Sequence, residues 1–430
     1  FDTIYEIIYN PMQLLIKKAT ILCASSIYHL KKKDLLIKDG VIVKIADRIT
    51  ESATNIIDQK NTYVSLGWVD VYADFCDPGY EHQETINTGI EAACAGGFTD
   101  VFIIPNTNPT TSNKSAVEYI KNHTGIVNVH PIGAVSKNIE GKDLAEMNDM
   151  HAAGAVAFSD GKKTIQDSGL MLKALQYVKT FDGVIIEIPE DLGISKNGLM
   201  HEGTVSTGIG VQGKPALAED IHTYRNIELL RYTQSNIHLT GISTKKSMDL
   251  TRQAKKQHLA VSCSVSPYHL LYNHTQLESY NSIYKVNPPL RTEEDRKALI
   301  KAVEDGIVDC IASHHTPQHI DNKQVEFAYA KNGMITLQTM LNMLTKVSDH
   351  ITLEKWIALL TEKPRELFKL KKQTIAQGAT ACLTVFNTTS DWPYDQSSNK
   401  SLSQNSPLYG QTLTGKILCV VNNHQYQIHE

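Results

Sequence analysis

The chain has 430 residues, of which 41% are hydrophobic and 20% are charged, as in an ordinary soluble globular protein. Its formal net charge of -4 argues against a nucleic-acid partner, and no apolar run approaches the ~20 residues that a membrane helix needs. The 7 cysteines include no CxxC pair, and several lie in apolar runs, which indicates reduced, buried thiols in a cytoplasmic protein.

Short β-rich runs occur at both ends of the chain. The strands that we predict from them are 14–22, 34–40, 41–47, 381–386 and 415–421. Asp39-Gly40 is a good hairpin turn between the second and third of these runs. Neither end holds enough strands to close its own core, so we expect the two ends to pair in one small β domain. The Ser/Asn/Asp-rich segment 388–407 is expected to be a mobile loop, and residues 1–11 are left out of the fold prediction.

Between these ends, from Tyr63 to about Phe368, the chain alternates strands and helices. The predicted strands are 64–71, 100–104, 126–132, 155–158, 183–188, 236–239, 259–263 and 308–312. The predicted helices are 85–95, 115–122, 144–153, 168–180, 218–235, 247–257 and 293–304. Strands that alternate with helices imply a parallel sheet, and eight such units close a TIM barrel. Continuous apolar runs such as 182–188 (DGVIIEI) fit strands that are buried on both faces.

The stretch 66–109 carries the most specific motifs. An apolar strand ends at the turn Asp77-Pro78-Gly79, and a helix follows and ends at Gly96-Gly97. A second strand stops at Pro105. The loops of this unit follow the C-terminal ends of its strands, where barrel enzymes keep their catalytic residues.

This stretch resembles the opening of the dihydroorotases, which are metal-dependent cyclic amide hydrolases of the amidohydrolase superfamily. The family's pattern there is roughly G-x-V-D-x-H-V-H-L-R-E-P-G, followed later by P-N-T-N-P. The resemblance covers the chain from Leu14 to Val421. It implies a barrel at 63–368, flanked by a small β-sandwich built from 14–62 and 369–430.

In the family, one or two zinc ions lower the pKa of a bound water, and a carboxylate on the last strand moves the proton. The positions that correspond to these groups hold Tyr72, Asp74, Asp160, Ile188, Gly241 and His314. Only Asp160 keeps the family's residue. Tyr72 and Asp74 replace an HxH pair, and His314 replaces the catalytic aspartate. Losing five of six groups is incompatible with the family's zinc site, so we expect no metal there.

Some metal-binding side chains remain, and each has two interpretations. Asp160 is either a bridging carboxylate or a loop carboxylate that holds the next turn. His238 is either a ligand or a hydrogen-bonded core residue. His314 and His315 resemble a metal pair, but neighbours on a strand face opposite ways. A rebuilt zinc site made of Asp74, Asp160, His238 and His314 is the alternative to a site without metal.

The substrate pocket that the resemblance implies is kept in part. Asn106 and Asn287 match family residues that contact dihydroorotate. Cys76 stands where the family has an arginine, which removes the bidentate anchor for the substrate carboxylate. Turn and cap motifs, including Asp77-Pro78-Gly79 and the segment 287–296, are close to intact. The fold is therefore expected to persist while the reaction is lost.

Two classes of function follow from these observations. The first is a dihydroorotase-like pseudoenzyme of pyrimidine biosynthesis, which resembles metal-free homologues that assemble with aspartate transcarbamoylase. The second is a working hydrolase of dihydroorotate or another cyclic amide, with an altered metal site. A ligand-sensing use of the emptied pocket is a third reading. We expect the first, as a self-associating subunit that binds its partner through the barrel-mouth loops and the segment 318–329.

Overall fold

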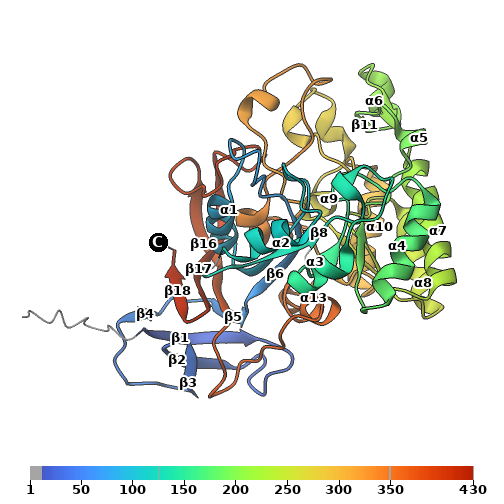
Figure 1. Cartoon of the computed structure of the whole chain (residues 1–430). Helices are drawn as coiled ribbons and strands as arrows, with labels where there is room; N and C mark the ends of the chain where they lie inside the picture. Colours follow the sequence, from blue (N-terminus) through green and yellow to red (C-terminus); the bar gives the residue numbers. More distant parts are fainter. Residues whose placement is uncertain (1–11, 124, 348–349, 430) are drawn as a thin grey trace, which may run out of the picture.

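Eight parallel strands form a nearly closed barrel in the computed structural model, which describes residues 12–123, 125–347 and 350–429 (Figure 1). In sheet order they are β15 (Cys310–Ile311), β14 (Val261–Val265), β13 (Ile237–Leu239), β10 (Ile185–Glu187), β9 (Ala157–Phe158), β8 (Asn128–Gly133), β7 (Phe98–Ile103) and β6 (Trp68–Ala73). Ala73 and His315 form a bridge between β6 and the chain after β15, where the Asp74 N–H donates to the His315 carbonyl at 2.9 Å. The predicted TIM barrel is confirmed.

Helices surround this barrel, as the alternating pattern predicted. They are α1 (Ile86–Ala95), α2 (Lys114–Lys121), α3 (Met147–Ala153), α4 (Ser168–Lys179), α7 (Ala216–Thr233), α8 (Lys245–Lys256), α10 (Glu293–Glu304), α12 (Leu353–Leu360) and α13 (Glu362–Leu367). Several begin after a side chain that accepts a hydrogen bond from the first turn: Thr85, Asn113, Asp167, Thr244 and Thr292. These caps satisfy backbone donors that the helix itself leaves open, and so fix where the helices start.

Shorter elements lie in the connections. They are α5 (Leu192–Ser195), α6 (Thr204–Gly208), α9 (Pro267–Leu271), α11 (Met340–Leu344), β11 (Met200–His201), β12 (Gly213–Lys214), η1 (Lys137–Ile139), η2 (His274–Leu277), η3 (Ser282–Tyr284), η4 (Ile320–Asn322) and η5 (Leu337–Thr339). Strands β11 and β12 pair in a separate parallel sheet. Each of these elements is too short to show a hydrophobic period, so the sequence pattern predicted none of them.

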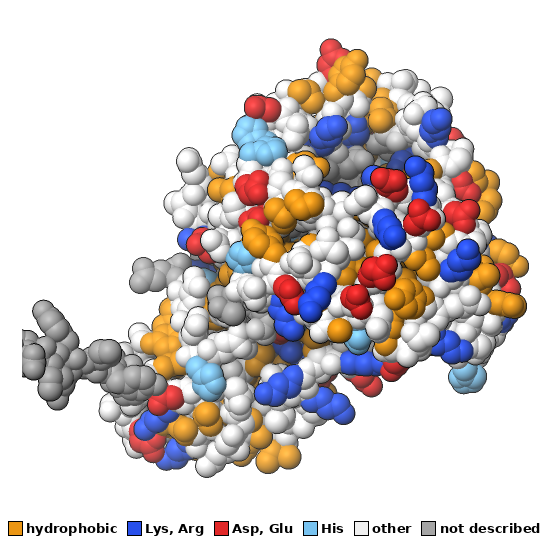
Figure 2. All heavy atoms as spheres, in the orientation of Figure 1, with side chains coloured by type: hydrophobic (Ala, Val, Ile, Leu, Met, Phe, Trp, Pro, Cys, Tyr) orange, Lys and Arg blue, Asp and Glu red, His pale blue; other side chains and the backbone are white. Residues whose placement is uncertain are grey.

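Charged side chains of both signs are interspersed on the face shown in Figure 2.

The 7 cysteines are all buried and unpaired, as predicted. Over the described ranges, no helix combines the length and the apolar character that crossing a membrane requires. The cytoplasmic location stays a prediction.

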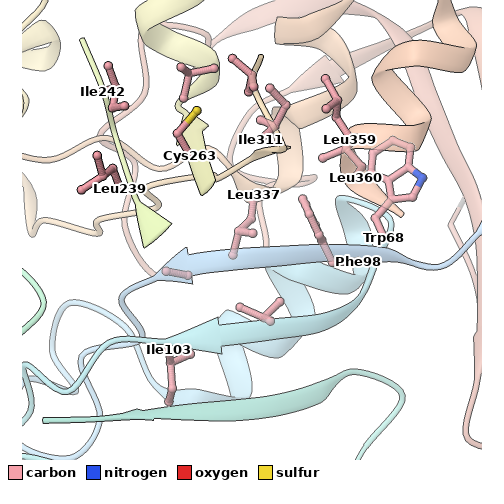
Figure 3. Packing of buried hydrophobic residues seen from close by; sticks show 14 of the residues in the cluster. Trp68, Phe98, Ile103, Leu239, Ile242, Cys263, Ile311, Leu337, Leu359 and Leu360 are labelled. Atoms are coloured by element: carbon pink, nitrogen blue, oxygen red, sulfur yellow. The ribbon is translucent and has the colours of Figure 1, made fainter. Parts of the chain in front are cut away.

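The hydrophobic core has two layers around the barrel wall. Side chains such as Val69, Phe102 and Ile186 fill the barrel interior. A larger cluster lies between the strands and the surrounding helices, where Leu359 and Leu360 of α12 approach Trp68 (Figure 3). Removing a buried aromatic side chain from such a layer destabilises a protein by about 3–5 kcal/mol.

The two ends of the chain form one continuous sheet, which we call the terminal sheet. Its strands in order are β18 (Gln425–Ile428), β17 (Gln411–Asn422), β16 (Leu383–Tyr394), β5 (Thr62–Leu66), β1 (Gln13–Leu22), β2 (Lys32–Lys38) and β3 (Val41–Ala46), and β4 (Asn55–Ile57) pairs with β1. The pairing of the two termini is confirmed, since Leu383 lies opposite Leu66 in the β16–β5 ladder. Asp39 and Gly40 turn the chain between β2 and β3 with φ of 46° and 75°, as a tight hairpin requires.

The predicted strand 64–71 was wrong in one respect, because the structure divides it between the two sheets. β5 pairs with β1 and β16 in the terminal sheet, and only β6 belongs to the barrel. The division falls at Gly67, which packs directly against Thr99. A Cβ atom at position 67 would lie 2.3 Å from the Thr99 side chain. The boundary between the terminal sheet and the barrel therefore lies at Gly67 rather than at Tyr63.

The segment predicted as a loop at 388–407 also differs from expectation. Strand β16 continues to Tyr394, and the chain after it folds down onto the barrel. The Ser401 hydroxyl and the Leu402 N–H both bond the buried Glu84 carboxylate. The Asn405 amide accepts from the Gln318 N–H at 3.1 Å and donates to the Thr316 carbonyl at 3.0 Å. The polar side chains that suggested a solvated loop instead bond buried groups of the barrel.

Candidate functional site

A small cavity of about 130 Å³ lies at the C-terminal end of the barrel strands. The residues that line it are Tyr72, Lys162, Ile188, Tyr268, Val286, Asn287, His314, Thr316, Asn332 and Gly333. The barrel thus brings together four of the predicted site positions: Tyr72, Ile188, Asn287 and His314. Tyr72 lies in β6, Ile188 directly follows β10, and His314 lies three residues after β15. Asn287 comes from the loop before α10. Loops at the C-terminal ends of parallel barrel strands meet at one face, which explains why residues so far apart in sequence come together here.

Tyr72 and His314 form the centre of the site. Their rings stack with centroids 4.5 Å apart and an interplanar angle of 26°. The Nε2 atom of His314 lies 2.9 Å from the Thr240 hydroxyl oxygen. Burial lowers the pKa of His314 to about 3, helped by His269 and His238, so the imidazole is neutral at neutral pH. Burial and the Asp74 carboxylate raise the pKa of Tyr72 well above its usual value. Two neutral rings therefore occupy this position.

Gly241 lies beside the His314 ring and has φ of +66°, in the left-handed region that favours glycine. A Cβ atom at position 241 would lie 2.6 Å from Cε1 of His314. The His314 ring thus fills the space into which a side chain at position 241 would project.

Asp74 is held in place by two protein groups. Its carboxylate accepts the N–H of Cys76 at 2.9 Å and pairs with the Lys162 ammonium group. Burial and the Asp74 charge raise the pKa of the Cys76 thiol, which is therefore neutral. Cys76 cannot replace an arginine as an anchor for a carboxylate. Lys162 was missed by the sequence reasoning, although it stands only two residues after Asp160.

Asp160 bonds the backbone of the preceding barrel loop. One carboxylate oxygen accepts the N–H groups of Val135 and Ser136 at 3.0 and 2.9 Å, and the other accepts the Ser136 hydroxyl. Burial raises the pKa of Asp160 to about 6. Of the two interpretations of this residue, the contacts match a carboxylate that holds a loop.

His238 lies inside the barrel wall, away from the cavity. Its two ring nitrogens lie 2.9 Å from the Ser262 hydroxyl and 3.0 Å from the Ser264 hydroxyl. Burial lowers the pKa of His238 to about 3. The contacts are those of a hydrogen-bonded core residue. His314 and His315 lie beyond the end of β15 and bond different groups, since Nδ1 of His315 accepts the Thr336 N–H at 3.1 Å while Nε2 of His314 lies beside the Thr240 hydroxyl.

The two asparagines predicted to contact a substrate bond protein groups instead. Asn287 donates to Glu190 at 3.0 Å and accepts from Lys214 at 2.7 Å. Its side-chain amide is therefore already paired on both sides. Asn106 donates to the Asp160 carbonyl at 3.2 Å and accepts the Lys162 N–H at 2.9 Å. Sequence reasoning missed the Glu190–Lys214 ion pair, because these residues lie in a segment without a clear pattern.

The metal-binding capacity of the site can be judged from the atoms that would bind the ion. Within the part of the chain that the structure describes, no three His, Cys, Asp or Glu side chains are grouped so as to hold a metal ion. The four members of the conceivable rebuilt site are each engaged by other protein groups: Asp74, Asp160, His238 and His314. The residues present at this barrel mouth therefore do not fit a zinc ion.

Comparison with known proteins identifies related sequences over almost the whole chain. A family model described as dihydro-orotase-like matches residues 63–247. A protein named dihydroorotase from Acetivibrio thermocellus is 38% identical over 404 residues, which cover 92% of this chain and 95% of that protein. A protein of the same name from Ruminiclostridium cellulolyticum is 37% identical over 411 residues, with 94% and 96% covered.

Solved structures with the same fold are found among the hydantoinases. L-hydantoinase (dihydropyrimidinase) from Arthrobacter aurescens aligns with a TM-score of 0.84 and 22% identity, over 97% of this chain and 98% of that chain. D-hydantoinase from Bacillus sp. AR9 aligns with a TM-score of 0.81 and 19% identity, over 96% and 95%. These similarities show a common fold of barrel and terminal sheet.

Proposed function

Because this chain belongs to the dihydroorotase family, we propose that it serves pyrimidine biosynthesis as a catalytically inactive, dihydroorotase-like partner of aspartate transcarbamoylase. The observation that carries the inactivity is the stacked pair of Tyr72 and His314 beside Gly241. This packing occupies the barrel mouth with neutral rings where the family positions zinc ligands and a catalytic carboxylate.

The chemistry of amide hydrolysis supports this proposal. An unactivated cyclic amide needs a nucleophile stronger than water and a base that takes its proton. His314 is neutral, but its Nε2 lies against Thr240 rather than open to the cavity. The Asp74 carboxylate is paired with Lys162, and both oxygens of Asp160 accept hydrogen bonds from the chain. None of these groups is placed to activate a water molecule.

We propose aspartate transcarbamoylase as the partner because the overall shape of the molecule has been maintained. Relatives named dihydroorotase are matched along nearly their whole length, which indicates that the framework of the fold has been kept. The framework maintains the shape of the surface, and a protein partner recognises that shape. A specific interface buries about 1,200 Å² or more in total.

One surface that we propose for this contact is the segment 318–329, which exposes Val325 and Tyr329. The segment is held rigidly. The buried Lys323 ammonium group donates to the carbonyls of Lys285, Lys331 and Gly333 at 3.3, 2.9 and 3.2 Å. A surface that is already ordered loses little conformational entropy on binding, which favours its use as an interface.

Co-expression with aspartate transcarbamoylase, followed by light scattering, tests the partnership. We expect one co-eluting complex, and a transcarbamoylase whose activity or stability falls when this chain is withheld. Dihydroorotate hydrolysis and carbamoyl-aspartate cyclisation should both stay at background. Separate elution at micromolar concentration, with a transcarbamoylase that is fully active alone, would refute the scaffold role.

A second candidate function is an active dihydroorotase, or another cyclic amide hydrolase, with an altered site. It is favoured by the names of the relatives, which are 35% to 38% identical to this chain. Turnover of dihydroorotate that depends on added zinc and disappears in the variant His314→Ala would establish this alternative. Turnover unchanged in that variant would point to a contaminating enzyme.

A further inference from the structure

A groove of about 440 Å³ lies on the outside of the barrel, where the terminal sheet meets it. Helices α1 and α11 and the turn η5 form the barrel side, and strands β16, β17 and β18 form the other side (Figure 1). The residues that line this lateral groove are Ala95, Gln338, Leu341, Asn342, Trp392, Pro393, Ser397, Ser398, Lys400, Gly415, Lys416, Ile417, Gln427, Ile428 and His429. None of them lines the cavity around Tyr72 and His314. The volume lies within the range of about 300–1,000 Å³ that small-molecule sites occupy.

Two lysines give the lateral groove a positive charge. Within the described residues, the ammonium groups of Lys400 and Lys416 form neither an ion pair nor a hydrogen bond, and no aspartate or glutamate lines the groove. The carboxylates of Asp391 and Asp395, on the same stretch of chain as Lys400, accept hydrogen bonds from hydroxyl and N–H groups at 2.7 and 2.9 Å. Unpaired cations that share one groove attract an anion.

His429 shows that the two lysine charges act on one place. Burial lowers the pKa of His429 to about 4, and the charges of both Lys400 and Lys416 contribute to this lowering. The imidazole is therefore neutral at neutral pH, and the positive charge of the groove comes from the two ammonium groups. An anion bound beside His429 would be close to both of them.

The loop that carries Lys400 is fixed to the barrel. The Gln338 side chain donates to the Ser398 carbonyl at 2.7 Å and accepts the Lys400 N–H at 2.9 Å. The backbone on both sides of position 399 is thus held by one buried amide of η5. A site whose backbone is already ordered loses less conformational entropy when a ligand binds.

The opposite wall offers an aromatic surface and a hydrogen-bond acceptor. The indole N–H of Trp392 donates to the Gly415 carbonyl at 2.7 Å. The Asn342 amide, which is 1% exposed, donates to the Thr414 and Gly415 carbonyls at 2.8 and 2.7 Å. Its Oδ1 atom accepts no hydrogen bond from the described part of the chain. A buried acceptor without a donor favours a ligand that supplies one.

We propose that the lateral groove binds a phosphate monoester of a ring-bearing alcohol, such as a nucleoside 5′-monophosphate. The phosphate pairs with Lys400 and Lys416, the ring lies against Trp392, and a ligand N–H or O–H group donates to Oδ1 of Asn342. A phosphate monoester carries about −1.5 to −2 charge at pH 7, which two ammonium groups neutralise and a single carboxylate would not require. Planar rings stack favourably on aromatic side chains. This site is separate from the proposed scaffold role and does not depend on it.

Isothermal titration calorimetry of the full chain tests the site, with adenosine 5′-monophosphate, uridine 5′-monophosphate, inorganic phosphate and adenosine as probes. At least one nucleotide should bind with a Kd of about 1 mM or lower, more tightly than inorganic phosphate, and adenosine should not bind measurably. The variants Lys400→Met and Lys416→Met should each weaken nucleotide binding about tenfold or more. Lys60→Met, at an exposed lysine just before β5, is the matched control and should bind like wild type.

The His429 ring gives a second readout, by proton NMR. A bound phosphate offsets the charges of Lys400 and Lys416, so the pKa of His429 should rise from about 4 when the nucleotide is added. The signal of this ring is the one that disappears in His429→Gln. Absence of binding by both nucleotides, binding that persists unchanged in the double lysine variant, or a His429 pKa that does not respond would each overturn the proposal. Equal affinities for inorganic phosphate and the nucleotides would overturn the place assigned to the ring. Because the chain is tested alone, none of these results bears on the transcarbamoylase partnership.

Discussion

The imidazole ring of His314 occupies the space that a side chain at Gly241 would need, since a Cβ atom there would lie 2.6 Å from Cε1 of His314. These two positions lie 73 residues apart and belong to different strands' loops, yet neither can be changed without regard to the other. The absence of a side chain at position 241 and the position of the ring at 314 are therefore structurally coupled.

The variant Gly241→His should be strongly destabilised, because the new side chain meets the His314 ring and the backbone there has φ of +66°. Combining it with His314→Asp removes the ring, so the double variant should be more stable than the sum of the single effects. A coupling of about 0.5–3 kcal/mol is expected between residues in contact. Urea unfolding of the four proteins measures it, and strictly additive effects would contradict the packing described here.

Stability should decrease at acid pH through Asp100. Burial opposes its charge, but the hydrogen bond from His130 and the charge of Arg365 hold the pKa of Asp100 well below its usual range. A carboxylate with a lowered folded-state pKa stabilises the fold above its unfolded pKa of about 3.9, and this stabilisation is lost as pH falls below that value.

Asp100→Asn should remove this part of the acid dependence. It should also destabilise the protein at neutral pH by about 3–5 kcal/mol, because the buried Arg365 loses its partner at 2.7 Å. Unfolding curves at a series of pH values test both statements. Asp47→Asn, at an exposed surface pair, is the matched control and should change stability by less than about 0.5 kcal/mol. An unchanged acid slope in Asp100→Asn would assign the effect to other groups.

The melting temperature should not respond to zinc or to its removal. A metal that binds the folded state stabilises it by an amount that grows with the logarithm of the metal concentration divided by the dissociation constant. Because Asp74, Asp160, His238 and His314 are engaged by other protein groups, we expect no such effect from added zinc or from a chelator. A rise of several degrees with zinc that is lost in Asp160→Asn would show that the rebuilt site forms.

Lys323→Met should loosen the segment 318–333. The ammonium group of Lys323 donates to three backbone carbonyls, and the thioether would leave them without a donor at about 1–3 kcal/mol for each. Amide hydrogen exchange of this segment should become faster, while exchange in the terminal sheet should not. Lys331→Met, at an exposed lysine in the same segment, should exchange like wild type. Equal exchange in the two variants would show that Lys323 does not anchor the segment.

The barrel was predictable because its signals are local. Buried strands alternate with helices, and caps such as Thr85 and Thr292 mark the helix starts in the sequence. The break at Gly67 was not predictable, because it depends on Thr99, which is distant in sequence and only close in the fold. The packing of the segment after Tyr394 onto the barrel was missed for a similar reason, since its partners Glu84 and Gln318 are supplied by the barrel.

The sequence predicted which residues lie at the candidate site, but it did not predict the groups that their side chains bind. Three of the predicted site positions, Tyr72, Ile188 and His314, do line one cavity. The ion pair of Asp74 with Lys162 and the bonding of Asn287 to Lys214 could not be read from the sequence, because both depend on side-chain directions across different loops. Residue types at the strand ends predicted which side chains line the cavity, and only the coordinates show what those side chains bind.

The pairing of β5 with β16 also has a consequence for folding during synthesis, because the two strands are made far apart in time. Leu66 pairs with Leu383, which is 383 − 66 = 317 residues further along the chain. At a synthesis rate of about 5–20 residues per second, roughly 15 to 60 s pass between the emergence of the two strands from the ribosome. Throughout that time β5 can pair with β1 on one side, while its other edge remains an open template for another chain. The first barrel strand follows directly from this edge, so the whole barrel is synthesised before the terminal sheet can be completed.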